Sequence, residues 1–214
     1  VGLAVVLVPV LTGREAGAGA VLVGGAVQLA VLFMAGNSFG SDGPATANEM
    51  LTGVDPVVLV RAKARSVIVS ASPLAILGPL IAATITNEWN YLPAGVAVGV
   101  GGLYAGAGAA MLQSSIVPIA IPQSDNPLAS GDSGKGCFAG LMLAAVLFGL
   151  AILTLPAALA LLWALDQGSV TLVSAFAVAT VGAGVLIMHG GAALAARRWR
   201  VRGPELFAAS VAAR

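Results

Sequence analysis

Charged residues are scarce in this chain of 214 residues. Asp, Glu, Lys and Arg together make up 9% of it, against roughly 25% in a soluble domain. Apolar residues make up 58%, and the mean hydropathy is +0.98. Because a charge is costly at the centre of a lipid bilayer, this composition excludes an ordinary soluble domain and predicts an integral membrane protein.

Cysteine and histidine are almost absent. The one cysteine, Cys137, cannot form an internal disulfide, and with no histidine near it in sequence it is a poor nucleophile candidate. The one histidine, His189, cannot make a metal site alone, and we interpret it as a helix-end residue bonded to a carbonyl or water. No basic face is interleaved with aromatics, which argues against nucleic acid as a partner. The sequence therefore predicts no metal site and no bound cofactor.

Catalytic motifs are also missing or incomplete. The stretch 131–136, GDSGKG, fails the phosphate-binding loop pattern twice, because position 129 is Ala and position 136 is Gly. The stretch 36–40, GNSFG, matches Gly-x-Ser-x-Gly around Ser38, but it lacks the strand–turn–helix context of a nucleophile. We interpret Ser38 as part of a helix-end turn. No acid lies inside an apolar run, which weighs against a proton-coupled carrier.

Uncharged runs define the predicted spans, since about 20 apolar residues cross the hydrocarbon core. The fold class expected is an all-α membrane bundle of six helices. The first helix is short, and the opening VGLAVVLVPV is not a signal peptide, so we expect a chain that begins inside a truncated helix. The predicted spans are 1–12, 16–36, 64–86, 93–115, 137–165 and 169–194.

The basic residues predict the orientation. With the loop 37–63 placed inside, nine of the ten Lys and Arg residues lie on the cytoplasmic side and only Arg14 lies outside. Residues 1–196 then form the transmembrane domain and 197–214 a cytoplasmic tail, with both termini inside. The outer loops are short, at 88–93, where Trp and Tyr would anchor the interface, and at 166–168.

The loop 37–63 has helix signals of its own. The predicted helix 44–52 begins with Pro44 at its first helical position and ends before Gly53, which suits a left-handed C-terminal cap. Asp55 and Pro56 predict a second helix, with Asp as N-cap. We expect that second helix, separate from the one at 44–52, to lie at the membrane interface before it enters the membrane as the third span.

Small residues recur at spacings of three and four in two spans, a pattern that lets helices approach closely in lipid. Prolines at 73 and 79 are predicted to kink the third span. The predicted helix-packing positions of the fourth span are Gly95, Gly99, Gly102 and Gly106, and those of the sixth are Ala175, Ala179 and Gly182.

Three stretches resemble one family. They are NSFGSDGPA at 37–45, the turn at 125–127 and the tail at 202–206. They resemble permease subunits of ABC transporters of the ABC-2 type, especially actinobacterial ones, and the predicted topology agrees. In that family the first cytoplasmic loop carries a coupling helix that docks on the ATPase. The positions that the resemblance assigns to this contact are Asp42, Gly43, Glu49, Met50, Leu51, Thr52 and Gly53.

The resemblance implies the membrane component of an ATP-driven exporter of a hydrophobic or amphipathic compound, in the bacterial cell membrane. ATP and Mg would be bound by partner ATPase subunits, and a second six-helix half or a homodimer mate would complete the pathway. Three alternatives stay open: a membrane scaffold or sensor that recruits a cytoplasmic protein, a secondary carrier, and, least favoured, a serine hydrolase using Ser38.

Overall fold

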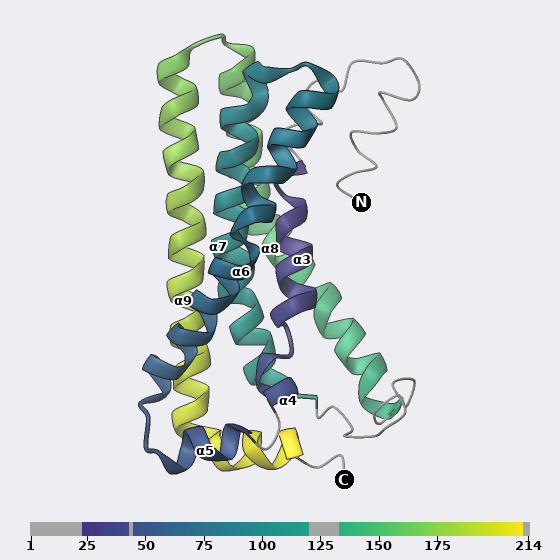
Figure 1. Ribbon diagram of the computed structural model, residues 1–214, viewed down its shortest axis with the longest axis vertical. Helices are drawn as coiled ribbons and strands as arrows, with labels where there is room; N and C mark the ends of the chain where they lie inside the picture. The colour runs from purple at the N-terminus through teal and green to yellow at the C-terminus, as the bar shows by residue number, and fades with distance from the viewer. Residues whose placement is uncertain (1–22, 43–44, 120–132, 212–214) are drawn as a thin grey trace.

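The computed structural model describes residues 23–42, 45–119 and 133–211, and every regular element in these ranges is a helix. Figure 1 shows the long helices running side by side along the long axis of the molecule. The elements are α3 (Ala26–Ala35), α4 (Ser38–Asp42), α5 (Ala45–Leu51), α6 (Pro56–Thr86), the 3₁₀ turn η1 (Trp89–Tyr91), α7 (Leu92–Ile116), α8 (Ser133–Asp166) and α9 (Val170–Val211).

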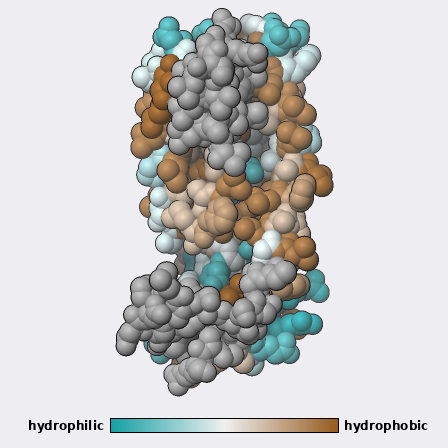
Figure 2. Space-filling view, turned by 90° about the vertical axis from the view of Figure 1, so that its right-hand side faces the viewer, coloured by the Kyte–Doolittle hydropathy of each residue, from teal (hydrophilic) through white to brown (hydrophobic). Residues whose placement is uncertain are grey.

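Four helical segments in the described ranges are long and apolar enough to cross a membrane. They are Pro56–Thr86, Trp89–Ile116, Gly140–Asp166 and Val170–Ala208. Figure 2 shows hydrophobic residues gathered around the middle of the molecule and hydrophilic ones toward its two ends. The class of fold is therefore as predicted. The predicted span 1–12 lies outside the described residues, and 16–36 is described only from residue 23, so the count of six stays a prediction.

Helix α7 is the centre of the bundle. In the most apolar 18-residue stretch of this helix 72% of the residues are buried, against 11–28% in the corresponding stretches of the other three spanning helices. It packs against α3, α6, α8 and α9, while the outer helices expose large apolar side chains such as Phe148 and Val178. Since lipid is as apolar as these side chains, close packing on α7 rather than apolar burial must hold the bundle together.

The glycines predicted to pack lie on the sides of α7 that meet α3 and α6. A Cβ at Gly99 would lie 2.4 Å from the carbonyl oxygen of Ala75 on α6. A Cβ at Gly24 would lie 2.2 Å from the carbonyl oxygen of Gly95. The same approach brings α3 side chains against two further positions, Gly102 and Gly106. Backbones this close leave no room for a side chain.

The contact between α7 and α9 uses other glycines. A Cβ at Gly184 would lie 2.2 Å from the carbonyl oxygen of Gly101, and a Cβ at Gly191 would lie 2.4 Å from that of Gly108. On each helix the two glycines are seven residues apart, which is about two helical turns. These two crossings set the distance between the helices.

The small face predicted for the sixth span is wrong for packing within this chain. Ala175, Ala179 and Gly182 are all exposed, and a Cβ at Gly182 would meet nothing within 4 Å. Helix α9 carries small residues on two faces. Spacing alone therefore could not identify the face that meets α7.

The helix predicted to start at Asp55 and Pro56 is present, and it runs without a break from Pro56 to Thr86 as α6. Asp55 caps it as expected, accepting a hydrogen bond from the Val57 amide at 2.7 Å. Residues 57–72 contain no Gly or Pro, so nothing ends the helix at the membrane boundary. Pro73 and Pro79 both lie inside it.

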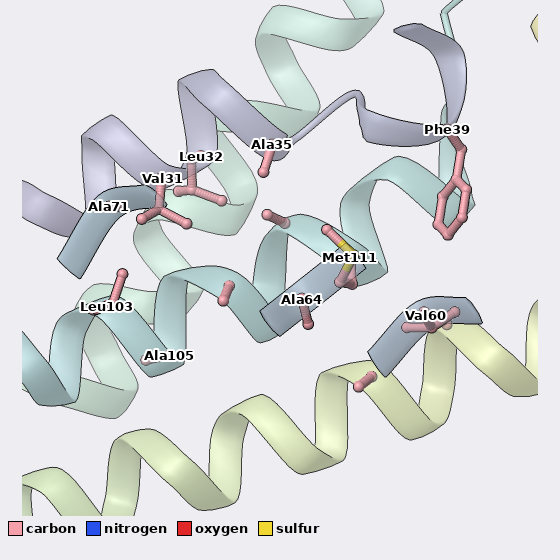
Figure 3. Close-up of a cluster of buried hydrophobic side chains, with 14 of the residues drawn as sticks. Val31, Leu32, Ala35, Phe39, Val60, Ala64, Ala71, Leu103, Ala105 and Met111 are labelled. Atoms are coloured by element: carbon pink, nitrogen blue, oxygen red, sulfur yellow. The ribbon is translucent and has the colours of Figure 1, made fainter. Parts of the chain in front are cut away.

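The main core is formed by buried side chains of α3, α4, α6 and α7 (Figure 3), joined by others from α8 and α9. The largest that are fully buried include Leu32, Phe39 and Met111. Fully buried alanines such as Ala71 and Ala105 belong to the same core. The core continues beyond the end of α3 to Phe39, so α4 is built onto the same packing as the bundle.

Helix α9 extends well past its predicted span. It runs to Val211, with non-helical dihedral angles at Arg202 (φ −127°, ψ 22°) that mark a bend. Figure 1 shows its last turns crossing the lower end of the molecule beside α5. The described part of the predicted tail is therefore helical. At the start of α8, residues 133–136 are helical too, although we expected a loop there.

Candidate functional site

The predicted loop helix exists, and it lies at the lower end of the bundle (Figure 1). Helix α5 covers Ala45–Leu51, within the predicted 44–52. Gly53 has φ +67°, the left-handed conformation that a C-terminal glycine cap needs. Gly43 lies outside the described residues. Helices α4 and α5 thus connect α3 to α6 without entering the apolar middle.

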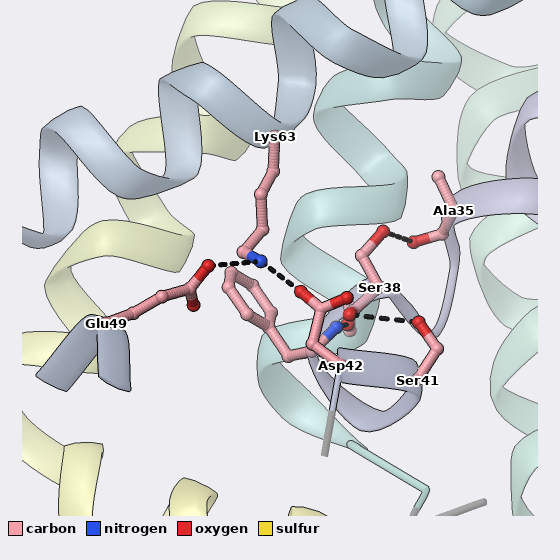
Figure 4. A network of polar contacts seen from close by, with 8 residues as sticks. Ala35, Ser38, Ser41, Asp42, Glu49 and Lys63 are labelled. Atoms are coloured by element: carbon pink, nitrogen blue, oxygen red, sulfur yellow. Dashed lines mark hydrogen bonds and ion pairs between the residues drawn. The ribbon is translucent and has the colours of Figure 1, made fainter. Parts of the chain in front are cut away.

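Lys63 of α6 is the centre of a polar cluster at this end. Its Nζ donates to Asp42 Oδ2 at the end of α4 and to Glu49 Oε1 of α5, the latter at 3.0 Å (Figure 4). Only 15% of the Lys63 side chain is exposed. The same ammonium lies 5.4 Å from the centre of the Phe39 ring, within cation–π range. One cation therefore joins three helices.

An aromatic pair extends this cluster to α9. The rings of Phe39 and Trp199 have centroids 4.8 Å apart and are tilted by 54°. The Phe39 amide donates to Ser114 Oγ of α7 at 2.8 Å. We call Phe39, Asp42, Glu49, Lys63 and Trp199 the Lys63 cluster. Its members come from α4, α5, α6 and α9, so a displacement of α5 acts on two membrane helices.

Two further contacts fix the loop at either side of the cluster. The Asn37 side chain donates to the Ile119 carbonyl and accepts from the Ile119 amide, each at 2.8 Å. Arg200 Nη2 donates to both carboxylate oxygens of Asp55 at 3.1 Å. The hydrogen bond from the Val57 amide, and then that from Arg200, hold the pKa of Asp55 below its ordinary value of 3.8.

The positions assigned to an ATPase contact divide into two groups. Asp42 and Glu49 turn inward to Lys63. Leu51 is 84% exposed, and Thr52 and Gly53 are exposed beside it. The structure places Met50 on α5 and does not describe its side chain. The exposed tip is therefore the part of α5 that can touch a partner, and the two acids attach α5 to the bundle.

Three buried polar side-chain atoms on α5 and on Trp199 have no hydrogen-bond partner among the described residues. They are Thr46 Oγ1, Glu49 Oε2 and Trp199 Nε1, all buried. Two of the three atoms belong to residues of the Lys63 cluster, Glu49 and Trp199.

A cavity of about 180 Å³ lies higher in the bundle, between α3, α7, α8 and α9. Its walls are mainly small or apolar side chains. The polar groups in it are Gln28, whose Nε2 donates to Thr154 Oγ1 at 3.4 Å, and Thr180. No charged residue lines it. The space can accept a small neutral group, and its polar lining escaped notice in the sequence because Gln28 is a single uncharged residue.

The three residues with reactive side chains are not brought together. Ser38 Oγ donates to the Ala35 carbonyl at 2.7 Å, as in a helix-end turn. His189 is exposed on α9, and no hydrogen bond joins it to Ser38 among the described residues. Cys137 lies near the start of α8, and its side chain is not described. Within the described ranges no three His, Cys, Asp or Glu side chains are grouped to hold a metal ion.

Sequence inspection missed Lys63, Phe39 and Trp199. Lys63 is one of only two lysines and sits between arginines, so it was counted as a positive-inside charge alone. Its partners are 21 and 14 residues away in sequence. A pairing of this kind depends on where the turns place α4 and α5.

Comparison with protein-family models, with curated proteins and with solved structures finds no match to this chain. What the structure shows is a helical protein with four segments able to span a membrane and a short helix, α5, outside them. The function therefore has to be argued from the site.

Proposed function

We propose that this chain is the membrane subunit of an ATP-driven exporter of the ABC-2 type. In this proposal the lower end of the bundle and both termini are cytoplasmic, in a bacterial cell membrane. A partner ATPase binds ATP and Mg and docks on α5. A second six-helix half or a second copy completes the pathway for a hydrophobic or amphipathic compound.

The observation that carries the proposal is the attachment of α5. This helix of 7 residues lies outside the spanning segments and exposes Leu51 at its tip. Its Glu49 bonds Lys63 of α6. Through Phe39, the same lysine is in contact with Trp199 of α9. A force applied at Leu51 is thus received by two long helices that both pack on α7.

The charge distribution supports the orientation. Arg61, Lys63 and Arg65 lie in the first turns of α6, and four more arginines lie between 197 and 202 on α9. Both groups are at the end of the bundle that carries α5 (Figure 1). Lys and Arg are enriched on the cytoplasmic side of membrane proteins, so α5 would face the compartment in which ATP is available.

The test is a charge at the exposed tip. Leu51→Arg should weaken binding of the partner ATPase by about thirtyfold, the effect of losing an interface hot spot. Folding should be unaffected, because surface substitutions change stability by about 0.5 kcal/mol or less. Affinity and ATPase stimulation would be measured with both proteins purified.

Val58→Arg is the matched control, since Val58 is exposed at the same end of the molecule but lies on α6. Unchanged affinity in Leu51→Arg would show that α5 is not the docking element. A wild-type chain that binds a cytoplasmic protein through Leu51 without stimulating ATP hydrolysis would instead be a scaffold or sensor.

A further inference from the structure

An open groove lies between the lower ends of α7 and α9, with a volume of about 360 Å³. Its walls come from about one turn of α7 and about two turns of α9 and are almost entirely carbon. The residues that line it are Leu112, Ile116, Leu194, Val201, Arg197, Arg198 and Arg202. Four aliphatic side chains and three arginines thus share one surface.

The groove lies at the boundary between lipid and water. Residues 167–196 carry no Lys, Arg, Asp or Glu, and Arg197 is the first charge after this run. Leu194 is less than one turn above it, toward the apolar middle. At 1.5 Å per residue, the α9 side of the groove extends about 12 Å from Leu194 to the bend at Arg202. The aliphatic part therefore faces acyl chains and the arginines lie at headgroup level.

The arginines have unused capacity to bind an anion. Arg197 has no ion pair among the described residues. Arg198 uses only Nε, which donates to the Ser115 carbonyl at 3.3 Å, out of five N–H donors. Arg202 is 4.0 Å from Glu205, a long contact in which both side chains are mostly exposed. Because aliphatic walls hold the arginine stems, the guanidinium groups stand at the rim.

We propose that this groove binds an anionic phospholipid, with an acyl chain against Leu112, Ile116 and Leu194 and the headgroup phosphate at Arg197 and Arg202. Guanidinium groups pair with phosphate oxygens through parallel hydrogen bonds. Basic pockets between membrane helices on the cytoplasmic side are suited to such headgroups. The lipid would hold α9 against α7 next to Trp199, and its binding does not depend on the partner that docks on α5.

The experiment uses the purified full chain in a zwitterionic detergent, without any ATPase. Phosphatidylglycerol and phosphatidylcholine with identical acyl chains are titrated separately, and bound lipid is counted by native mass spectrometry. Wild type should bind phosphatidylglycerol at least tenfold more tightly. The double variant Arg197→Gln/Arg202→Gln should lose about fivefold per arginine. Arg198 is left in place because it also bonds the backbone of α7.

The matched control is Arg61→Gln/Arg65→Gln, which removes the same charge from exposed positions at the same end, on α6. It should change affinity less than twofold. Val201→Glu, at a position 73% exposed on the groove, gives an independent variant and should also repel the headgroup. Circular dichroism confirms the helix content of each variant.

Three results would overturn the proposal. Equal affinity for the two lipids would show that the groove does not recognise the headgroup. Equal losses of lipid affinity in the Arg197/Arg202 and Arg61/Arg65 double variants would show that the lipid responds only to the overall positive charge at this end of the molecule. Displacement of the lipid by the same concentration of free glycerol phosphate would mean that the site takes a soluble phosphate and has no use for the acyl chain.

Discussion

The crossing of α7 and α9 at Gly108 and Gly191 gives the sharpest test of the fold. A Cβ at Gly191 would lie 2.4 Å from the Gly108 carbonyl oxygen, whereas ordinary van der Waals contact begins at 3.4 Å. A Cβ at Gly190, the preceding residue, would have nothing within 4 Å. Gly191→Ala and Gly190→Ala therefore add the same methyl group to the same helix in opposite surroundings.

The magnitude follows from the lack of space. To admit the methyl group the helices must separate by roughly 1 Å, and a gap of that size forfeits a quarter to a half of the dispersion energy along the seam. Overpacking of this kind costs about 1–3 kcal/mol. Both variants share the gain of up to about 1 kcal/mol in helix propensity when Ala replaces Gly. The difference between them is therefore the packing cost alone.

The assay is thermal unfolding of the two variants in the same detergent, followed by circular dichroism and by tryptophan fluorescence. At about 2–4 °C per kcal/mol for a chain of this size, the midpoint of Gly191→Ala should lie about 2–12 °C below that of Gly190→Ala. Equal midpoints would refute the close approach of α7 and α9. The inverse order would place the packed face of α9 where we find the exposed one.

Two further substitutions test the loop contacts. Lys63→Met leaves Asp42 and Glu49 without their cation, so we expect α5 to lose about 1–3 kcal/mol of local stability. Faster amide hydrogen exchange in residues 45–51 would show this loss. Arg61→Met, at an exposed position of the same helix, should leave that exchange unchanged. Asp55→Asn keeps a good N-cap but loses the charge that pairs with Arg200. Since the pKa of folded Asp55 lies below 3.8, the pair adds stability above the unfolded pKa and loses it as pH falls through the folded one. The difference in melting midpoint between wild type and Asp55→Asn should thus be constant from pH 7 to pH 5 and shrink as pH falls below 3.8 towards the folded pKa. A difference that does not change with pH in that range would show that the ion pair is not its source.

Local signals in the loop were reliable because they act within a few residues. Pro56 follows an N-cap in both prediction and structure, and the glycine at 53 adopts the left-handed conformation expected of it. The start of α6 follows the same logic. The capped helix runs on from Pro56 into the third span because residues 57–72 contain no Gly or Pro to end it.

The candidate site was predicted only in outline. Leu51 stands exposed as a partner contact would, but Asp42 and Glu49, assigned to the same surface, turn inward to Lys63. A charged side chain near a membrane boundary can face water, a headgroup or another charge. The choice among them is made by the fold, because the cost of leaving a half-buried charge unpaired exceeds the cost of ordering its partner.

By itself the sequence determined the helical membrane class, because lipid tolerates neither many charges nor unpaired backbone groups. It also determined the helix α5 through its caps. Only the tertiary structure decided which glycines of α9 meet α7, since small residues lie on two of its faces. It alone joined Lys63 to acids 21 and 14 residues away and set Arg197 beside the aliphatic end of α7. Hydrophobic content depends on composition alone. Contacts between helices depend on how each helix is rotated about its axis, and that rotation is fixed only when all the helices are packed together.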